Sequence, residues 1–159
     1  MDTNILSVLY YRGKDLRVSY QAQSTKEWWE RERGLFQLYT SVIAEDELAQ
    51  GKYPNQKKAL AQAQRLGYLQ VNATVRRYHQ LYLIEGLVPE SKPEDAIHLA
   101  LAVVHNMDYL LTWNHAHLAN VQVQERLRLL NVREGYRAPF LVSPDTIPRA
   151  MYGKDVRRG

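Results

Sequence analysis

Short apolar runs alternate along most of the chain with longer segments of mixed polarity. The short runs are rich in aromatic and aliphatic residues, and they predict strands at 35–40, 68–71, 109–113 and 140–142. The longer segments have capping residues and glycine stops that predict helices at 16–33, 41–50, 54–66, 74–84, 91–104 and 119–130. Strands separated by helices favour parallel pairing with right-handed crossovers. The pattern therefore predicts an α/β fold, a three-layer sandwich with a mostly parallel central sheet.

The clearest helix signal begins at Ser91. Ser91-Lys92-Pro93-Glu94 has the form of a capping box, in which the serine hydroxyl and the Glu94 carboxylate each satisfy a free backbone N–H. Residues 96–104 are apolar almost all round, which is typical of a helix buried on most sides. The run at 109–113 contains no charged residue, so it predicts an inner strand.

The N-terminal end does not follow this pattern. The first strand of such a fold normally lies at the centre of the sheet, yet only Met1 precedes the acidic Asp2. The next apolar stretch, 5–11, is ended by Gly13. Two explanations stay open: the first strand is very short, or the sequence starts late, for example from a misassigned start codon.

Length and composition limit the classes of protein. The chain has 159 residues, enough for one domain, which we place at 1–148, followed by a basic C-terminal tail at 149–159. The absence of cysteine excludes disulfides, thiolate zinc sites and cysteine nucleophiles. The net charge of +4 favours a polyanionic partner such as nucleic acid. No apolar run reaches the ~18 residues of a membrane span, and no signal-like segment opens the chain, so we expect a cytoplasmic protein without a membrane partner.

Polar residues with metal-binding chemistry follow the predicted strands. Asp2 lies at the end of the expected first strand, Glu47 on the short helix after the second, Asp95 in the first turn of the capped helix, and Asn114 after the 109–113 strand. In open α/β sheets, ligands bind beyond the carboxyl ends of the strands. Carboxylates that converge there repel one another unless a cation lies among them, and Mg²⁺ or Mn²⁺ prefers such oxygen ligands.

Three stretches together resemble PIN domains of the VapC-like toxin group. The segment Asp95-Ala96-Ile97-His98, continued through 99–102, 107–114 and 117–118, is similar to the C-terminal half of those domains. Residues 2–6 are similar to their opening motif, and 41–51 to the segment that carries their second acid. Glu27-Trp28-Trp29-Glu30 is common in one subgroup, so the resemblance covers most of the chain.

The resemblance implies a metal-dependent ribonuclease that hydrolyses phosphodiester bonds in RNA. It implies Asp2, Glu47 and Asp95 as ligands of Mg²⁺ or Mn²⁺, with Asn114 as a fourth catalytic residue. The family often has aspartate at that fourth position, which predicts weak binding of a second ion. The resemblance also implies the toxin of a toxin–antitoxin pair, with a small antitoxin protein as partner and a homodimeric state.

Further side chains are candidates for orienting ligands or phosphate oxygens. Ser41 and Thr112 carry hydroxyls near the strand ends, and His98 lies three residues after Asp95, on the same helix face. His115 and His117 have the spacing of a zinc pair but lack further ligands. Basic residues could follow an RNA backbone or simply form a solvated face: Lys52, Lys57, Lys58, Arg65, Arg76 and Arg77.

Three other functions stay open. The first is a catalytically weak or inactive PIN-like module that binds RNA or protein, which Asn114 and the short N-terminal end favour. The second is a haloacid-dehalogenase-like phosphatase with Asp2 as nucleophile, although that class has aspartate where this chain has Asn4. The third is a receiver-like binding domain, which the lack of an adjacent acidic pair after an early strand disfavours.

Overall fold

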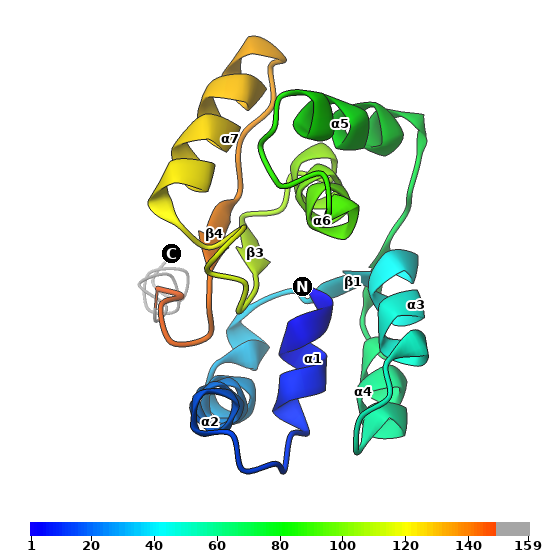
Figure 1. The fold of residues 1–159 in the computed structure, drawn as a ribbon, viewed down its shortest axis with the longest axis vertical. Coiled ribbons are helices and arrows are strands. Elements are labelled where there is room, and N and C mark those ends of the chain that lie inside the picture. The colour runs from blue at the N-terminus through cyan, green and yellow to red at the C-terminus, as the bar shows by residue number, and fades with distance from the viewer. Residues whose placement is uncertain (149–159) are drawn as a thin grey trace, which may run out of the picture.

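A computed structural model describes residues 1–148 of the chain, so the basic tail expected at 149–159 lies outside the described residues. The described part is a mixed α/β structure with seven α-helices and short parallel strands (Figure 1). The helices are α1 Thr3–Leu9, α2 Leu16–Arg31, α3 Val42–Gln50, α4 Gln56–Ala63, α5 Ala73–Ile84, α6 Pro93–Val104 and α7 Val121–Arg133, with a 3₁₀ helix η1 at Arg33–Leu35. None of the described helices combines the length and apolar character needed to cross a bilayer.

The four strands form two parallel pairs. The strands are β1 Tyr39–Ser41, β2 Gly67–Leu69, β3 Tyr109–Leu111 and β4 Phe140–Val142. Strand β1 pairs with β2, and β3 pairs with β4, in two separate two-stranded sheets. The α/β class and the parallel pairing predicted from the sequence are therefore confirmed for the described residues.

Two apolar clusters pack on opposite faces of the strands. One cluster is built mainly from α5, α6 and α7, and the other mainly from α1, α2, α3 and α4. Consecutive residues of β3 divide between them, since Leu110 belongs to the first cluster and Leu111 to the second. In Figure 1 the strands accordingly lie between the group α5–α7 and the group α1–α4. Helices thus cover both faces of the strands.

The N-terminal residues occupy a position between the two sheets. The α-ammonium of Met1 donates to the Tyr39 carbonyl of β1 at 2.8 Å, and the Asp2 N–H donates to the Leu111 carbonyl of β3 at 3.0 Å. Helix α1 begins immediately afterwards, with Asp2 as its N-cap. No strand precedes β1 within residues 1–148, and this two-residue segment joins the edges of both sheets.

The capping box predicted at Ser91 is wrong. Helix α6 begins at Pro93, with Lys92 as N-cap and no side-chain cap, and Glu94 instead forms an ion pair with Lys92 at 3.7 Å. A helix capped by Ser91 would need Lys92 in helical conformation, which the ring of the following proline disfavours. Pro93 therefore becomes the first helical residue, where its missing N–H is not needed.

Several strands are also shorter than predicted. Residues Arg33–Leu35 form η1, so the predicted strand 35–40 is reduced to Tyr39–Ser41. Strand β3 ends at Leu111, although the Thr112 N–H still donates to the Val142 carbonyl. At Trp113 the backbone N–H turns to the side chain of Asn4 instead. Tertiary contacts at the strand ends set these boundaries. The pattern of apolar and polar residues along the chain does not reveal such contacts.

Loss of one buried hydroxyl is expected to destabilise the helical layer α5–α7. The Tyr82 hydroxyl donates to Asn131 Oδ1 at 2.6 Å, and both side chains are fully buried, while Asn131 Nδ2 has no partner. Tyr82→Phe leaves the Asn131 amide without either bond, so we expect a loss of about 1–3 kcal/mol in the free energy of unfolding, measured by urea denaturation. Tyr20→Phe removes an exposed hydroxyl and should change stability by less than about 0.5 kcal/mol. Equal effects of the two changes would contradict this account.

Candidate metal centre

Asp2 is held at the end of β3 by neighbours on both sides. Its carboxylate accepts from Thr112 Oγ1 at 2.5 Å and from Asn4 Nδ2 at 2.6 Å, both on Oδ2. Asn4 is itself fixed, because its Oδ1 accepts from the Trp113 N–H at 2.9 Å. The Asp2 side chain is buried. Its second oxygen, Oδ1, accepts from the Asn4 backbone N–H at 3.5 Å, and His98 Nε2 lies 3.8 Å from it.

Glu47 reaches the same place from α3. Ser41 caps this helix, since its Oγ accepts from the Ala44 N–H at 3.3 Å. On Glu47, Oε2 accepts from the Thr3 hydroxyl and lies 3.3 Å from His98 Nε2. The other oxygen, Oε1, is buried and has no hydrogen-bond partner. A buried carboxylate oxygen of this kind can accept a bond from a water or bind a cation.

His98 lies between these two acids. It is 4% exposed and projects from α6, and one ligand atom each from Asp2, Glu47 and His98 lies within 4.8 Å of the others. The sequence placed His98 on the helix face of Asp95, as a candidate for orienting a metal ligand. In the structure its ring contacts the Glu47 carboxylate at 3.3 Å.

Asp95 lines the same pocket but is held by a different set of neighbours. A cavity of about 580 Å³ is bordered by Asp2, Glu47 and Asp95 together. The Asp95 carboxylate accepts on Oδ2 from Asn114 Nδ2 at 2.9 Å and contacts His117 Nδ1 at 3.2 Å. Its oxygens do not belong to the compact group formed by the other acids and His98 among the described residues. The closest set therefore differs from the predicted one, with an imidazole in the place of the third carboxylate.

The electrostatic shifts follow from this arrangement. Burial alone raises the pKa of Glu47, but the bond and the charge of His98 reverse this, so the net pKa is lowered. Burial raises the pKa of Asp95, and the charge of Asp2 raises it further against the opposing effect of His117. Burial disfavours the His98 imidazolium, yet the bond that it donates to Glu47 and the charges of both acids raise its pKa above the usual value. A protonated His98 thus offsets the negative charge of the acids.

Three residues that the sequence analysis did not select support the site. Thr3 donates to Glu47, Asn4 to Asp2, and His117 contacts Asp95. Thr3 and Asn4 follow an N-cap aspartate directly, and His117 is three residues after Asn114, whose Oδ1 accepts its N–H at 3.0 Å. These local spacings are the signals that could have identified them. Trp28 and Trp29 are buried in the core, so their rings are not exposed for stacking on RNA bases.

The donor set fits a divalent cation. Asp2 and Glu47 offer hard oxygen atoms, and Glu47 Oε1 lacks a partner. Carboxylates suit Mg²⁺ and Mn²⁺, while an imidazole in the set favours Mn²⁺ or a later transition metal over Mg²⁺. His115 does not join the set, because its ring bonds to the backbone carbonyl of Ala119.

Metal binding at this site is expected to strengthen as the pH rises. Burial and the Met1 α-ammonium lower the pKa of His98, but its bond to Glu47 and the charges of Asp2 and Glu47 raise it more, so the net pKa lies above its usual value. A dication beside Glu47 repels the imidazolium, so binding releases its proton. The Kd for Mn²⁺ should therefore fall as the pH rises through the raised pKa of His98, and level off once His98 is neutral in the metal-free chain. Calorimetry in buffers of different ionisation enthalpy measures both quantities, and a pH-independent Kd without proton release would contradict the prediction.

Comparison with protein-family models gave no match, and comparisons with curated proteins and with solved structures gave no significant match. The likeness to PIN domains therefore rests on the motifs quoted above.

Proposed function

We propose that this chain is a PIN-type ribonuclease that depends on Mg²⁺ or Mn²⁺. The observation that carries the proposal is the shared pocket of Asp2, Glu47 and Asp95, which come from three separate helices or their caps. Acids this far apart in sequence meet in one pocket only through the fold. The proposal includes a three-layer sandwich in which the two parallel pairs are halves of one central sheet.

Each acid of the pocket is oriented by its own neighbouring side chains. Thr112 and Asn4 orient Asp2, Thr3 orients Glu47, and Asn114 orients Asp95. Asp2 and Glu47 would hold the cation, with His98 beside them. A bound dication lowers the pKa of water and offsets negative charge on the phosphodiester and its leaving oxygen. Asn114 acts here through Asp95, as a positioning residue.

An RNA chain can approach the pocket over α3 and α4. Gln50, at the C-terminal end of α3, borders the pocket, and the exposed Lys52 lies two residues further along the chain. Lys57 and Lys58 of α4 are exposed as well. Exposed lysines near a phosphodiester-cleaving site neutralise backbone phosphates without selecting sequence. Within the proposal, the chain is the toxin of a toxin–antitoxin pair, acts as a homodimer in the cytoplasm, and is restrained by a small antitoxin protein.

The test is RNA turnover with purified protein. Single-stranded and structured RNA are incubated with Mg²⁺, Mn²⁺ or a chelator, and the products are resolved on a gel. The proposal predicts cleavage that needs the dication and is lost in Asp95→Asn. Equal cleavage by Asp95→Asn would identify a contaminating nuclease and contradict the proposal.

A second candidate is a PIN-like module that binds RNA or a protein without cleaving RNA. Two observations favour it: Asn114 stands where the family often has aspartate, and His98 offers a positive charge to the acids without a metal. In that case RNA binding weakens with added salt, and no divalent ion produces turnover. Measuring binding and cleavage on the same RNA separates the two functions.

A further inference from the structure

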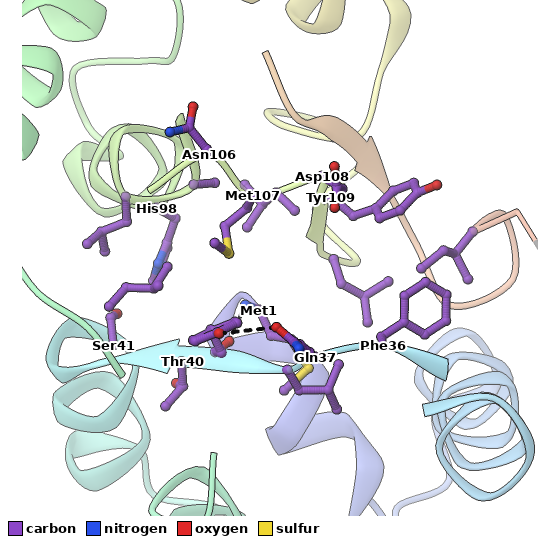
Figure 2. Close-up of a pocket in the computed structure, with 18 of the residues that line it drawn as sticks. Met1, Phe36, Gln37, Thr40, Ser41, His98, Asn106, Met107, Asp108 and Tyr109 are labelled. Carbon is purple, nitrogen blue, oxygen red and sulfur yellow. Dashed lines mark hydrogen bonds between the residues drawn. The ribbon is translucent and has the colours of Figure 1, made fainter. Parts of the chain in front are cut away.

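A cavity of about 380 Å³ separates the two parallel strand pairs (Figure 2). Strand β1 and the segment before it border one side, and β3 borders the other. Figure 2 shows Met107 and His98 on one side of the cavity and Gln37 and Thr40 on the opposite side. We call this cavity the inter-sheet slot.

Two strand edges face the slot: the edge of β1 that does not pair with β2, and the edge of β3 that does not pair with β4. The Leu38 carbonyl accepts from the Gly67 N–H of the β2 segment, so the backbone of the next residue, Tyr39, turns away from β2. The same alternation applies to β3, where Asp108 and Thr112 bond to the β4 segment and Leu111 therefore faces the slot. Within residues 1–148, no strand pairs with either edge.

Met1 and Asp2 already make the hydrogen bonds expected of the last two residues of a strand placed between these two edges. Met1 donates to the Tyr39 carbonyl on the β1 side, and Asp2 donates to the Leu111 carbonyl on the β3 side. Neighbouring residues that bond to opposite sides are the pattern of an inner strand in a parallel sheet. Continued backwards through the slot, the residue directly before Met1 would bond to β3 and the one before it to β1.

The walls of the slot specify the side chains of such a segment. Leu101 and Ala102 of α6 line one face and belong to the cluster built from α5–α7. Trp28 and Ile147 line the other face and belong to the opposite cluster. A strand covered on both faces by apolar residues is apolar at every position and rich in Val and Ile. The bordering length of about four residues corresponds to roughly 13 Å of extended chain.

We propose that the inter-sheet slot is an acceptor site for an extended apolar segment of about four residues that is joined to Met1 by a peptide bond, in a longer form of this chain. The segment lies parallel to β1 and β3 and turns the two strand pairs into one sheet. A peptide N–H at Met1 donates to the Tyr39 carbonyl as the ammonium does, without placing a charge in an apolar cavity. The same strand holds Asp2 at its end, so it also fixes one wall of the proposed metal centre.

The bonds of Met1 and Asp2 to β1 and β3 favour a segment continuous with this chain over a strand from a second protein. A strand that ended here and came from a second protein would place its terminal carboxylate beside the Met1 ammonium, and it would lose translational freedom on binding. A segment continuous with Met1 has no carboxylate at this point and loses no translational freedom. The proposal rests on the strand edges and not on the nuclease activity, so either can fail while the other stands.

The experiment adds residues to the N-terminus. One variant carries Met followed by Val-Ile-Val-Val before Met1, and the matched control carries Gly-Ser residues of the same number. We expect the apolar extension to raise Tm by about 5–10 °C over the control. Amide hydrogen exchange should slow at least ~10-fold at Tyr39 and Leu111, whose N–H groups gain partners in the strand. Equal Tm values and unchanged exchange at these residues would overturn the proposal.

Two further measurements address the source of the strand. The DNA directly upstream of the Met1 codon is read in frame, and the proposal expects a short run of apolar codons after an earlier start. A stop codon immediately before Met1 would overturn it. The free peptide Val-Ile-Val-Val is also added to the chain at excess concentration. Protection of Tyr39 and Leu111 by this peptide, without any gain from the attached segment, would assign the slot to a separate partner and overturn the covalent form.

Discussion

Replacing Glu47 by glutamine is expected to lower the rate of Mn²⁺-dependent RNA cleavage by about 100-fold or more. The loss of a residue that only orients a ligand typically reduces metal affinity or activity by about 10- to 100-fold, so losing a ligand should reach at least the upper end. Glutamine keeps the size of the side chain and its bond from Thr3, but it removes the negative charge and one acceptor pair. The change therefore acts on the cation and not on the packing of α3.

The matched control is Asp46→Asn on the same helix. Asp46 is exposed, while its neighbour Glu47 borders the pocket, so the two changes remove the same charge one residue apart. Cleavage rates are measured over a range of Mn²⁺ concentrations, and far-ultraviolet circular dichroism checks that both variants are folded. The control should retain its activity. A Glu47→Gln rate close to that of the control would show that Glu47 is not a ligand.

A divalent cation is expected to raise the melting temperature of the chain. Asp2 and Asp95 are buried in one pocket with Glu47, and the charge of Asp2 raises the pKa of Asp95. A bound dication relieves this repulsion only in the folded state, because the acids separate on unfolding. At about 100 times its Kd the ion contributes roughly 2.7 kcal/mol. For a domain of this size, that corresponds to a rise in Tm of about 5–10 °C.

Differential scanning calorimetry with and without Mn²⁺ measures this shift. Asp108→Asn serves as control, because Asp108 is an exposed acid that pairs with Arg137 away from the pocket. The control should show the full shift, whereas Asp2→Asn should show little of it. A Tm that stays the same up to millimolar Mn²⁺ or Mg²⁺ would count against a metal centre here.

The sequence predicted helices α2 to α7 from local signals and the parallel pairing from the alternation of strands and helices. Helix α1, at Thr3–Leu9, was not predicted and falls largely in the apolar stretch 5–11. The apolar helix after Pro93 and the strand at 109–111 are both present in the structure. The start of α6 was misplaced because a capping box and a proline gave conflicting signals, and the steric effect of Pro93 on Lys92 prevailed. The division into two strand pairs could not be predicted, since it depends on which edges meet in space.

The candidate site was predicted only in part, because its finer pairing depends on tertiary packing. Asp2, Glu47 and Asp95 do border one pocket, as the strand-end argument expected. The finer pairing was not accessible from spacing: His98 lies on the same helix as Asp95 but bonds to Glu47 of α3. Helix spacing identifies which residues share a face, whereas the neighbour opposite that face is set by tertiary packing.

The position of a bound metal tests the central claim most directly. A crystal of the chain soaked in Mn²⁺ and measured at the manganese absorption edge locates the ion through its anomalous scattering. The account predicts a peak at coordination distance from Asp2 and Glu47, inside the pocket that Asp95 also borders. An empty pocket at saturating Mn²⁺, with His98 still bonded to Glu47, would contradict it.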